Sequence, residues 1–431
     1  MKSPRSAPIL VAGAGPAGAT AARRLALAGR PVRLLDRRSF PRQKPCGGGI
    51  SVRALSRFPY LERGLTRIAT HTVRRLHLEG PGGQSAVIES DHAAALMIRR
   101  VEFDDLLVSM AVEAGAELVT GADIVTARES ADAVALTTRD GREFAAPLLI
   151  AADGVHSVIA RRLGINPGWA PSSVALDMME ETPRSALRDL DPSTLWVSYA
   201  HQSTRGAALS GPPPTLKGSA HGAGMGNSAP EGYAYIFPKR DHVNIGIGYI
   251  LSYYREALED SPYDLQRDFI DDLRRRHIVE GDSVRENFTP FLIPVGGPLP
   301  APARGRVLLA GDAGGFVNGF TAEGIYYAMV SGELAADAVL ADDPRPVADR
   351  YCRMVDKEMG DELRDSVLLQ RYLFADRRRI EAVIAGAARN QAMTRLILDF
   401  AMGRMNYRTL RRRMLTRSPM LAARLLWAHL N

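Results

Sequence analysis

Three glycines near the N-terminus have the spacing of a phosphate-binding turn. Gly13, Gly15 and Gly18 form a GxGxxG pattern, with Pro16 and Ala17 between the last two. The first glycine permits a tight turn, the second lets the backbone approach a pyrophosphate, and the third lets a helix pack closely on a strand. The N–H groups at the start of that helix would face the phosphates. The pattern therefore predicts a dinucleotide-binding site.

An acidic residue follows this pattern at the distance expected for a ribose contact. Asp36 lies eighteen residues after Gly18, with Arg37 beside it. A carboxylate at the end of the second strand of such a unit accepts hydrogen bonds from both ribose hydroxyls. Because it would also repel a 2′-phosphate, the site suits FAD or NAD rather than NADP.

Two later segments favour FAD. The sequences AADG at 151–154 and GDAGG at 311–315 each follow an apolar run, and the second precedes Gly324 and Ile325. Asp312 is placed to bind a ribityl hydroxyl, and a helix that begins near Gly324 would turn its N–H groups toward the flavin ring. The pair Asp153-Gly154 has two interpretations, a cofactor contact or only a turn.

A parallel α/β sheet is needed to position these residues. The sequence predicts a strand at Ile9–Ala12, a helix at Pro16–Leu27 and a strand at Pro31–Asp36, which together form a β–α–β unit. The chain returns to this sheet at 144–154 and again at 306–312. Elsewhere we expect helices at 101–114, 262–275 and about 322–340, and hairpins around Gly80–Gly83 and Asp140-Gly141.

This order of elements predicts a discontinuous nucleotide-binding domain with an insertion. We assign residues 1–70, 98–172 and 288–345 to the nucleotide-binding domain, 71–97 and 173–287 to a β-rich substrate domain, and 346–431 to a helical C-terminal region. Within the β-rich part, the segment 201–231 is rich in Gly, Ser, Pro and Ala, which predicts a long loop or lid.

Together with the RVEFD segment at 100–104, the three cofactor motifs resemble those of the flavoprotein hydroxylase superfamily, whose fold is that of p-hydroxybenzoate hydroxylase. Other details are similar to one branch, the geranylgeranyl reductase family, over roughly residues 1–340. They are KPCGGG at 44–49, YAYIFPK at 233–239 followed by VNIG at 243–246, and GDAGGFVNGFTAEGIYYAM at 311–329.

The resemblance implies a Rossmann-like FAD-binding domain with a β-rich insertion, and an enzyme that uses reduced FAD to saturate isoprenoid double bonds. It implies that Cys46 and Gly48 lie at the isoalloxazine and that Arg100 and Asp312 bind FAD. The further cofactor contacts expected are Pro45, Gly47 and Ile124. The substrate cavity would be lined by Tyr233, Tyr235, Phe237 and Pro238. The sequence departs from the family at Tyr235, where a tryptophan is usual.

We therefore expect a reductase of a hydrophobic, isoprenoid or acyl-like substrate. A hydride from reduced flavin would reach one alkene carbon and a proton the other, with Cys46, Tyr235 or an ordered water as alternative proton donors. The electron donor, NAD(P)H or another, stays open. The main alternative is a flavin-dependent monooxygenase or halogenase on the same fold, and a third is a flavin-stabilised binding protein without turnover.

Composition and charge set the remaining limits. The chain of 431 residues has two cysteines, Cys46 and Cys352, which favours a cytoplasmic setting. Its nine histidines show no metal-ligand spacing, and we assign no metal. Residues 371–431 hold thirteen arginines against three acidic residues, a balance of +10. This segment predicts peripheral contact with an anionic membrane or acidic carrier, or alternatively a solvated helical cap on the other domains. We expect no nucleic-acid partner.

Overall fold

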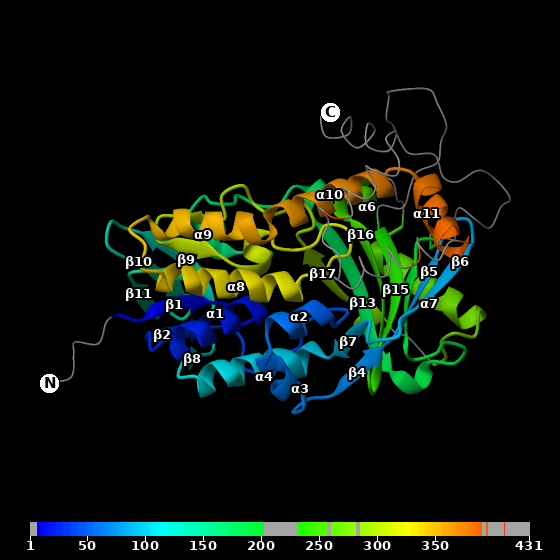
Figure 1. The fold of residues 1–431 in the computed structure, drawn as a ribbon, viewed down its shortest axis with the longest axis horizontal. Helices are drawn as coiled ribbons and strands as arrows, with labels where there is room; N and C mark the ends of the chain where they lie inside the picture. The colour runs from blue at the N-terminus through cyan, green and yellow to red at the C-terminus, as the bar shows by residue number, and fades with distance from the viewer. Residues whose placement is uncertain are drawn as a thin grey trace, which may run out of the picture.

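The computed structural model describes residues 7–201, 232–256, 260–281 and 285–389, together with Thr394 and Thr409. Two large sheets lie side by side along the long axis of the molecule (Figure 1). The N-terminal sheet is covered by helices on its faces, and the second sheet carries most of the middle of the chain.

The N-terminal sheet is parallel except at one edge. Its order is β18-β19-β12-β1-β2-β8, in which only β18 runs antiparallel to its neighbour. The strands are β1 (Ile9–Ala12), β2 (Val32–Leu35), β8 (Glu117–Val119), β12 (Leu149–Ala151), β18 (Ala303–Arg304) and β19 (Val307–Leu309). The predicted first unit is confirmed, because α1 (Pro16–Leu27) connects the paired strands β1 and β2.

The expected return at 144–154 is correct only in part. The run divides into β11 (Glu143–Ala146) and β12, and only β12 pairs with β1. Pro147 lies between them, and proline lacks the N–H that a continuous strand needs. β11 instead forms a three-stranded antiparallel sheet with β10 (Val134–Thr138) and β9 (Ile124–Glu129), so the hairpin predicted around Asp140-Gly141 is confirmed.

The second large sheet has the order β17-β13-β16-β15-β14-β5-β6. Its strands are β5 (Arg75–Glu79), β6 (Ser85–Glu89), β13 (Ala175–Pro183), β14 (Thr194–Ser198), β15 (Gly232–Pro238), β16 (His242–Ile250) and β17 (Thr289–Ile293). The hairpin predicted around Gly80–Gly83 is β5–β6. α7 (Pro262–Arg275) covers one face, where Phe269 stacks on Trp196 with ring centres 6.0 Å apart. Part of the sheet face that points away from α7 lines a cavity.

Smaller elements connect the two sheets. β3 (Gly49–Ser51), β7 (Ala95–Ile98) and β4 (Thr70–Val73) form a three-stranded sheet between them. The short helices are α2 (Val52–Arg57), α3 (Tyr60–Leu65), α5 (Val158–Arg162), α6 (Leu251–Glu256) and the single turns η1 (Pro171–Ser173), η2 (Arg184–Ala186), η3 (Arg285–Asn287) and η4 (Gly311–Gly314). The longer helices, in contrast, cover the faces of the sheets.

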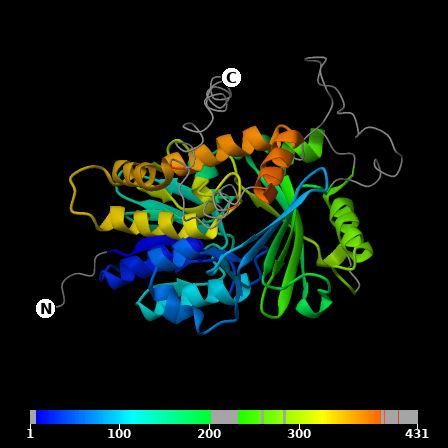
Figure 2. The ribbon, with the colours of Figure 1, turned by 45° about the vertical axis from the view of Figure 1, so that its right-hand side comes forward.

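Helix α4 (Arg100–Glu113) agrees with the prediction to one residue, whereas α8 (Ile325–Leu340) begins later than expected. The reason is local, because Ala322 has φ +56° and cannot continue a right-handed helix. α9 (Val347–Val355), the π-helical turn η5 (Asp356–Gly360) and α10 (Asp361–Phe374) then follow one another without a break. α10 carries the chain from the first sheet to the second (Figure 2).

The last described helix, α11 (Arg377–Arg389), packs on the β5–β6 hairpin, where Glu381 accepts a hydrogen bond from the Gly82 N–H at 2.8 Å. The loop predicted over 201–231 lies outside the described residues except for its first residue, and so does most of the basic segment 371–431. Within the described part of the chain, no helix combines the length and apolar character needed to cross a bilayer.

Candidate active site

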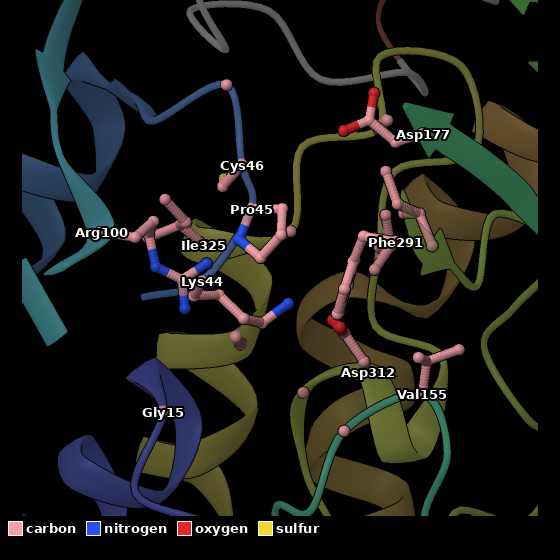
Figure 3. Close-up of a pocket in the computed structure, with 18 of the residues that line it drawn as sticks. Gly15, Lys44, Pro45, Cys46, Arg100, Val155, Asp177, Phe291, Asp312 and Ile325 are labelled. Carbon is pink, nitrogen blue, oxygen red and sulfur yellow. The ribbon is translucent and has the colours of Figure 1, made fainter. Parts of the chain in front are cut away.

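A cavity of about 650 Å³ lies between the two large sheets. It extends from the start of α1 to the aromatic residues of β15, and its walls include the loop at 42–49, the segment 311–325 and the end of α10 (Figure 3). The cavity lining contains nearly all the predicted site residues: Gly13, Gly15, Pro16, Ala17, Asp36, Arg37, Pro45, Cys46, Gly47, Gly48, Arg100, Ile124, Asp153, Gly154, Asp312, Gly324, Ile325, Tyr233, Tyr235 and Phe237. Gly18 and Pro238 lie outside it.

The glycines of the first turn have distinct structural reasons. Gly13 has φ +95°, and a Cβ there would lie 2.2 Å from the Ala152 carbonyl oxygen. A Cβ at Gly18 would lie 1.8 Å from the Gly13 carbonyl oxygen. Gly18 therefore packs against the turn and does not line the cavity. At Gly15 the nearest atom would be Nη2 of Arg42 at 3.7 Å, so this residue faces open space. The roles expected of Gly13 and Gly18 are confirmed.

Asp36 is held beside this turn by backbone donors. The N–H of Ala14 donates to Oδ2 and the N–H of Arg38 donates to Oδ1, each at 2.8 Å. These bonds fix the carboxylate at the end of β2 and leave each oxygen a further lone pair. The arrangement can accept two hydroxyls of a ribose.

A buried ion cluster lies next to the same turn. Arg100 donates to both oxygens of Asp104, at 2.7 and 2.8 Å, and Arg42 reaches Oδ2 of Asp104 at 3.1 Å. Burial lowers the pKa of Arg100, but the charge and hydrogen bonds of Asp104 together with Cys46 raise it overall, so the guanidinium stays charged. Arg42 lies near Gly15 and lines the cavity. Sequence reasoning missed it because an arginine in a loop has no distinguishing pattern.

The two predicted aspartates at 153 and 312 differ in their contacts. Asp153 accepts a hydrogen bond from the Ser157 hydroxyl at 2.6 Å and one from the Ile159 N–H at 3.2 Å, so its carboxyl holds the start of α5. The carboxyl of Asp312 lies 3.8 Å from the Cβ position of Gly324, at the N-terminus of α8. Asp312 therefore faces the cavity beside a helix start.

The loop at 44–49 stands between this region and the second sheet. The side-chain amide of Asn244 donates to the Cys46 carbonyl oxygen at 2.8 Å, and the Gly48 N–H points to Cys46 Sγ at 3.4 Å. A Cβ at Gly47 would lie 2.6 Å from the ring of Phe237, so the loop packs directly on β15. The loop is thus fixed from both sides, and Asn244 is a positioning residue that the VNIG motif contained without revealing its role.

Lys44 is the cation of this loop. Its Nζ lies 2.9 Å from the ring centre of Phe291. Burial and the nearby charge of Arg100 lower the pKa of Lys44 to about 8, against the opposing influence of Asp312. A partly desolvated ammonium in the cavity wall is suited to an anionic or electron-rich group.

The aromatic residues of β15 form one wall of the cavity, as their alternation predicted. Neighbouring ring centres are 6.4 Å apart for Tyr233 and Tyr235 and 4.6 Å apart for Tyr235 and Phe237. Tyr235 lies flat over Gly246 of β16, where a Cβ would be 2.5 Å from its hydroxyl oxygen. Pro238 is buried and is not among the residues that line the cavity, and its assignment as a substrate contact stays a prediction.

Asp177 on β13 is the acidic residue that sequence reasoning missed. The Tyr235 hydroxyl donates to its two oxygens at 3.1 and 3.2 Å, and both residues line the cavity. Burial raises the pKa of Asp177 to about 7, partly opposed by the hydrogen bond from Tyr235 and by Lys44. The only available signal was a carboxylate inside the apolar run VALDMM, which does not by itself distinguish a site from a structural pair.

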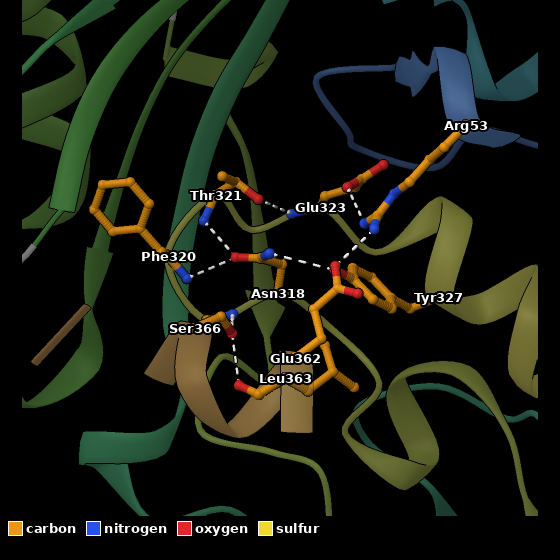
Figure 4. Close-up of polar contacts among 10 residues, drawn as sticks. Arg53, Asn318, Phe320, Thr321, Glu323, Tyr327, Glu362, Leu363 and Ser366 are labelled. Carbon is orange, nitrogen blue, oxygen red and sulfur yellow. Dashed lines mark hydrogen bonds and ion pairs between the residues drawn. The ribbon is translucent and has the colours of Figure 1, made fainter. Parts of the chain in front are cut away.

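A polar network supports the segment 318–324, which also lines the cavity (Figure 4). Asn318 Oδ1 accepts the N–H groups of Phe320 and Thr321 at 3.0 and 2.9 Å. Arg53 binds Glu323 at 2.9 Å and Glu362 of α10 at 2.6 Å. The segment is therefore held to α10 by charged pairs that are themselves largely buried.

These features fit FAD. The open face at Gly15, the carboxylate of Asp36 and the helix N-termini of α1 and α8 line one continuous cavity, and they supply the donors and acceptors that a pyrophosphate, a ribose and a flavin ring need. Asp36 and Gly15 would hold the adenosine diphosphate part. Asp312, Lys44 and the 44–49 loop would hold the flavin.

Comparison with known proteins agrees with this geometry. A family model described as an FAD binding domain matches residues 6–234. The chain is 33% identical to a menaquinone reductase of Mycobacterium tuberculosis over 81% of each protein. It is 28% identical to digeranylgeranylglycerophospholipid reductase 2 of Methanothermobacter thermautotrophicus, over 85% of this chain and 87% of that protein.

Solved structures show the same fold. A geranylgeranyl bacteriochlorophyll reductase-like protein of Thermoplasma acidophilum superposes with a TM-score of 0.75 at 19% identity, covering 98% of this chain and 99% of that one. Motifs, cavity, fold and relatives agree on the cofactor and on the class of enzyme. The chain therefore belongs to the geranylgeranyl reductase family of FAD-dependent oxidoreductases.

Proposed function

We propose that the protein saturates carbon–carbon double bonds in the isoprenoid chain of a hydrophobic substrate. The observation that carries the proposal is the continuity of the cavity, which leads from the FAD-binding residues past the 44–49 loop to the aromatic wall of β15. The names of the relatives, which include reductases of menaquinone and of a digeranylgeranyl lipid, support the same substrate class.

The walls of the cavity suit an apolar chain. Beyond Tyr233 the lining continues through Leu195, Phe320 and Phe374, and the Tyr233 hydroxyl is already occupied by the Thr321 carbonyl at 2.8 Å. Aromatic surfaces whose polar atoms are satisfied can bury an isoprenoid chain without leaving donors unpaired. The cavity thereby holds the alkene and excludes water from it.

The residues of this chain position the reaction rather than supply its electrons. Bound reduced FAD would provide the hydride for one alkene carbon. The 44–49 loop, fixed by Asn244 and Phe237, separates the flavin-binding part from the aromatic wall and so sets where the alkene can approach. Orientation of this kind is worth several kcal/mol, about 7 or more in favourable cases.

The test is the reoxidation of the reduced holoenzyme without oxygen. The flavin is reduced chemically under anaerobic conditions and mixed with geranylgeranyl diphosphate in micelles, and the flavin absorbance is followed. We expect its return with the unsaturated lipid and not with phytanyl diphosphate, the matched saturated chain. Reduced flavin that is indifferent to every unsaturated lipid, and reoxidises only with oxygen, would instead favour a monooxygenase or halogenase.

A further inference from the structure

We propose that Asp177, paired with Tyr235 in the cavity wall, is the acid that delivers the proton to the alkene carbon that does not receive the hydride. The inference rests on the proposed function, and it names the residue that supplies the proton in that reaction. The sequence alone leaves three alternatives for the proton donor, which are Cys46, Tyr235 and an ordered water.

The geometry places one buried carboxyl, paired with a phenol, in the wall of the cavity. Asp177 lies on β13 opposite Phe291 of β17 and is 5% exposed as a whole residue. Its partner Tyr235 projects from β15 across Gly246, and a Cβ at Gly248 would lie 3.5 Å from Asp177 Oδ1. The two glycines of β16 thus leave the space in which the carboxyl and the phenol meet. Figure 3 shows Asp177 across the cavity from Cys46 and above Phe291.

The surroundings favour the carboxyl over the two earlier candidates. Burial raises the pKa of Tyr235 well above its usual range, and its hydroxyl already donates to Asp177, so the phenol is a weak acid here. Cys46 Sγ accepts a hydrogen bond from the Gly48 N–H of its own loop, and Arg100 of α4 lies beside it. Asp177 is instead buried, and burial keeps its carboxyl protonated near neutral pH although the hydrogen bond from Tyr235 partly opposes this.

The titratable groups that face Asp177 come from three elements. They are Lys44 of the loop, Tyr233 and Tyr235 of β15, and Tyr254 of α6. Among these described groups only Lys44 carries a positive charge at neutral pH, and it opposes the effect of burial without cancelling it. The protonated form is therefore present below about pH 7 and is lost as the pH rises through that value.

The reaction balances with these groups. With the hydride that bound reduced FAD would supply to one alkene carbon, the π electron pair would form a C–H bond at the other carbon as the O–H bond of Asp177 breaks. The products are the saturated bond, oxidised flavin and the Asp177 carboxylate, which takes a proton from water before the next turnover. Tyr235 stabilises the carboxylate through its hydroxyl.

The experiment measures single-turnover reduction of geranylgeranyl diphosphate by reduced holoenzyme from pH 5 to pH 9. In the wild-type protein the rate should fall as the pH rises through about 7. Asp177→Asn should be slower on the order of 100-fold, as expected for loss of a general acid, and should lose this inflection. Tyr235→Phe should move the inflection to higher pH, because it removes the hydrogen bond that stabilises the carboxylate.

Tyr249→Phe is the matched control. It removes another buried tyrosine hydroxyl, which donates to the His201 carbonyl at 3.0 Å and lies outside the cavity lining, so its pH profile should equal that of the wild type. Equal rates and inflections in wild type and Asp177→Asn would overturn the inference alone. A wild-type protein that reduces no alkene at any pH would overturn the proposed function.

A second readout does not depend on turnover. The infrared difference spectrum of the FAD-bound protein between pH 6 and pH 8 should contain the carbonyl band of a protonated carboxyl, and that band should be absent from Asp177→Asn with the same flavin content. An identical spectrum in the two proteins would overturn the assignment of the proton to Asp177.

Discussion

Three buried carboxylates in and beside the cavity differ in their hydrogen-bond partners. Asp36 accepts two backbone N–H groups and keeps lone pairs for a ribose, whereas Asp104 is bracketed by Arg100 and Arg42. Asp177 is held by a phenol in a dry part of the wall. Because carboxyl groups with neutral donors hold protons more readily than those with cationic partners, the site separates cofactor binding from proton delivery by environment.

Asp312 provides a test of cofactor binding at the residue scale. We expect the purified protein to be yellow with about one FAD per chain, as a single cavity of this kind implies. Asp312→Ala should weaken FAD binding about 10-fold, because a ribityl hydroxyl would lose its acceptor in a shielded site. Flavin absorbance per chain after gel filtration and dilution measures this. Asp337→Ala, which removes the partner of Arg24 near the C-terminal end of α8 and outside the cavity lining, should retain its FAD; equal retention in both variants would contradict the role of Asp312.

At the scale of the element, the β1–α1 turn should depend on Gly13 for a steric reason. Gly13 and Gly29 both have positive φ, +95° and +74°, but a Cβ meets the Ala152 carbonyl only at Gly13 and finds no atom within 4 Å at Gly29. Alanine at either position carries backbone strain of about 1 kcal/mol. Gly13→Ala should in addition displace the turn and abolish FAD binding, while Gly29→Ala should bind FAD normally. Fluorescence titration with FAD and thermal unfolding distinguish the two, and a Gly13→Ala protein that binds FAD as tightly as Gly29→Ala would refute the steric argument.

Local signals explain which elements were predictable from the sequence. α1 and α7 agree with their predicted bounds because a proline marks the first turn of each, after Gly15 in α1 and the capping Ser261 in α7. The start of α8 and the division at Pro147 were missed because they depend on a backbone reversal and on strand pairing far away in the chain. The cofactor-binding glycines and Asp312 were predictable because they lie in recognisable sequence motifs.

The missed site residues share one property, which is that their role arises only through tertiary contacts. Asp177, Arg42 and Asn244 come from a strand, a loop and another strand, and they meet the site through residues more than 50 positions away. Nothing in their immediate sequence distinguishes them from structural polar residues. Pro238, in contrast, was assigned by its place in a motif and is not among the residues that line the cavity.

At the scale of the whole molecule, the cavity is formed between two sheets that differ in construction. The mainly parallel sheet and its helix N-termini supply the nucleotide-binding face, and the mixed sheet, in which β14 and β5 are the parallel pair, supplies the aromatic face. α10 and the 318–324 segment link the two, through Arg53, Glu323 and Glu362. The division of the chain into three domains stays a prediction, since it concerns how the parts fold rather than where they lie.

We also propose that the basic C-terminal segment brings the enzyme to an anionic surface, where a lipid substrate would be available. Residues 371–431 carry a balance of +10, and each arginine near such a surface contributes on the order of 1 kcal/mol. Vesicle flotation should show binding of the full chain to anionic vesicles that weakens with salt. It should be lost when Arg411, Arg412 and Arg413 are all changed to Glu; equal recovery of both proteins in the unbound fraction would contradict the proposal.

The central claim is that reduced FAD in this protein saturates an isoprenoid double bond without oxygen. The most direct measurement is the mass of the lipid product after anaerobic single turnover of the reduced holoenzyme with geranylgeranyl diphosphate, in normal water and in deuterated water. We expect a gain of two hydrogens per reduced bond, no added oxygen, and two solvent-derived deuterium atoms per bond in deuterated water, because the N–H of reduced flavin and the O–H of the acid both exchange with solvent. A product that forms only in air, and that contains oxygen or halogen, would contradict it.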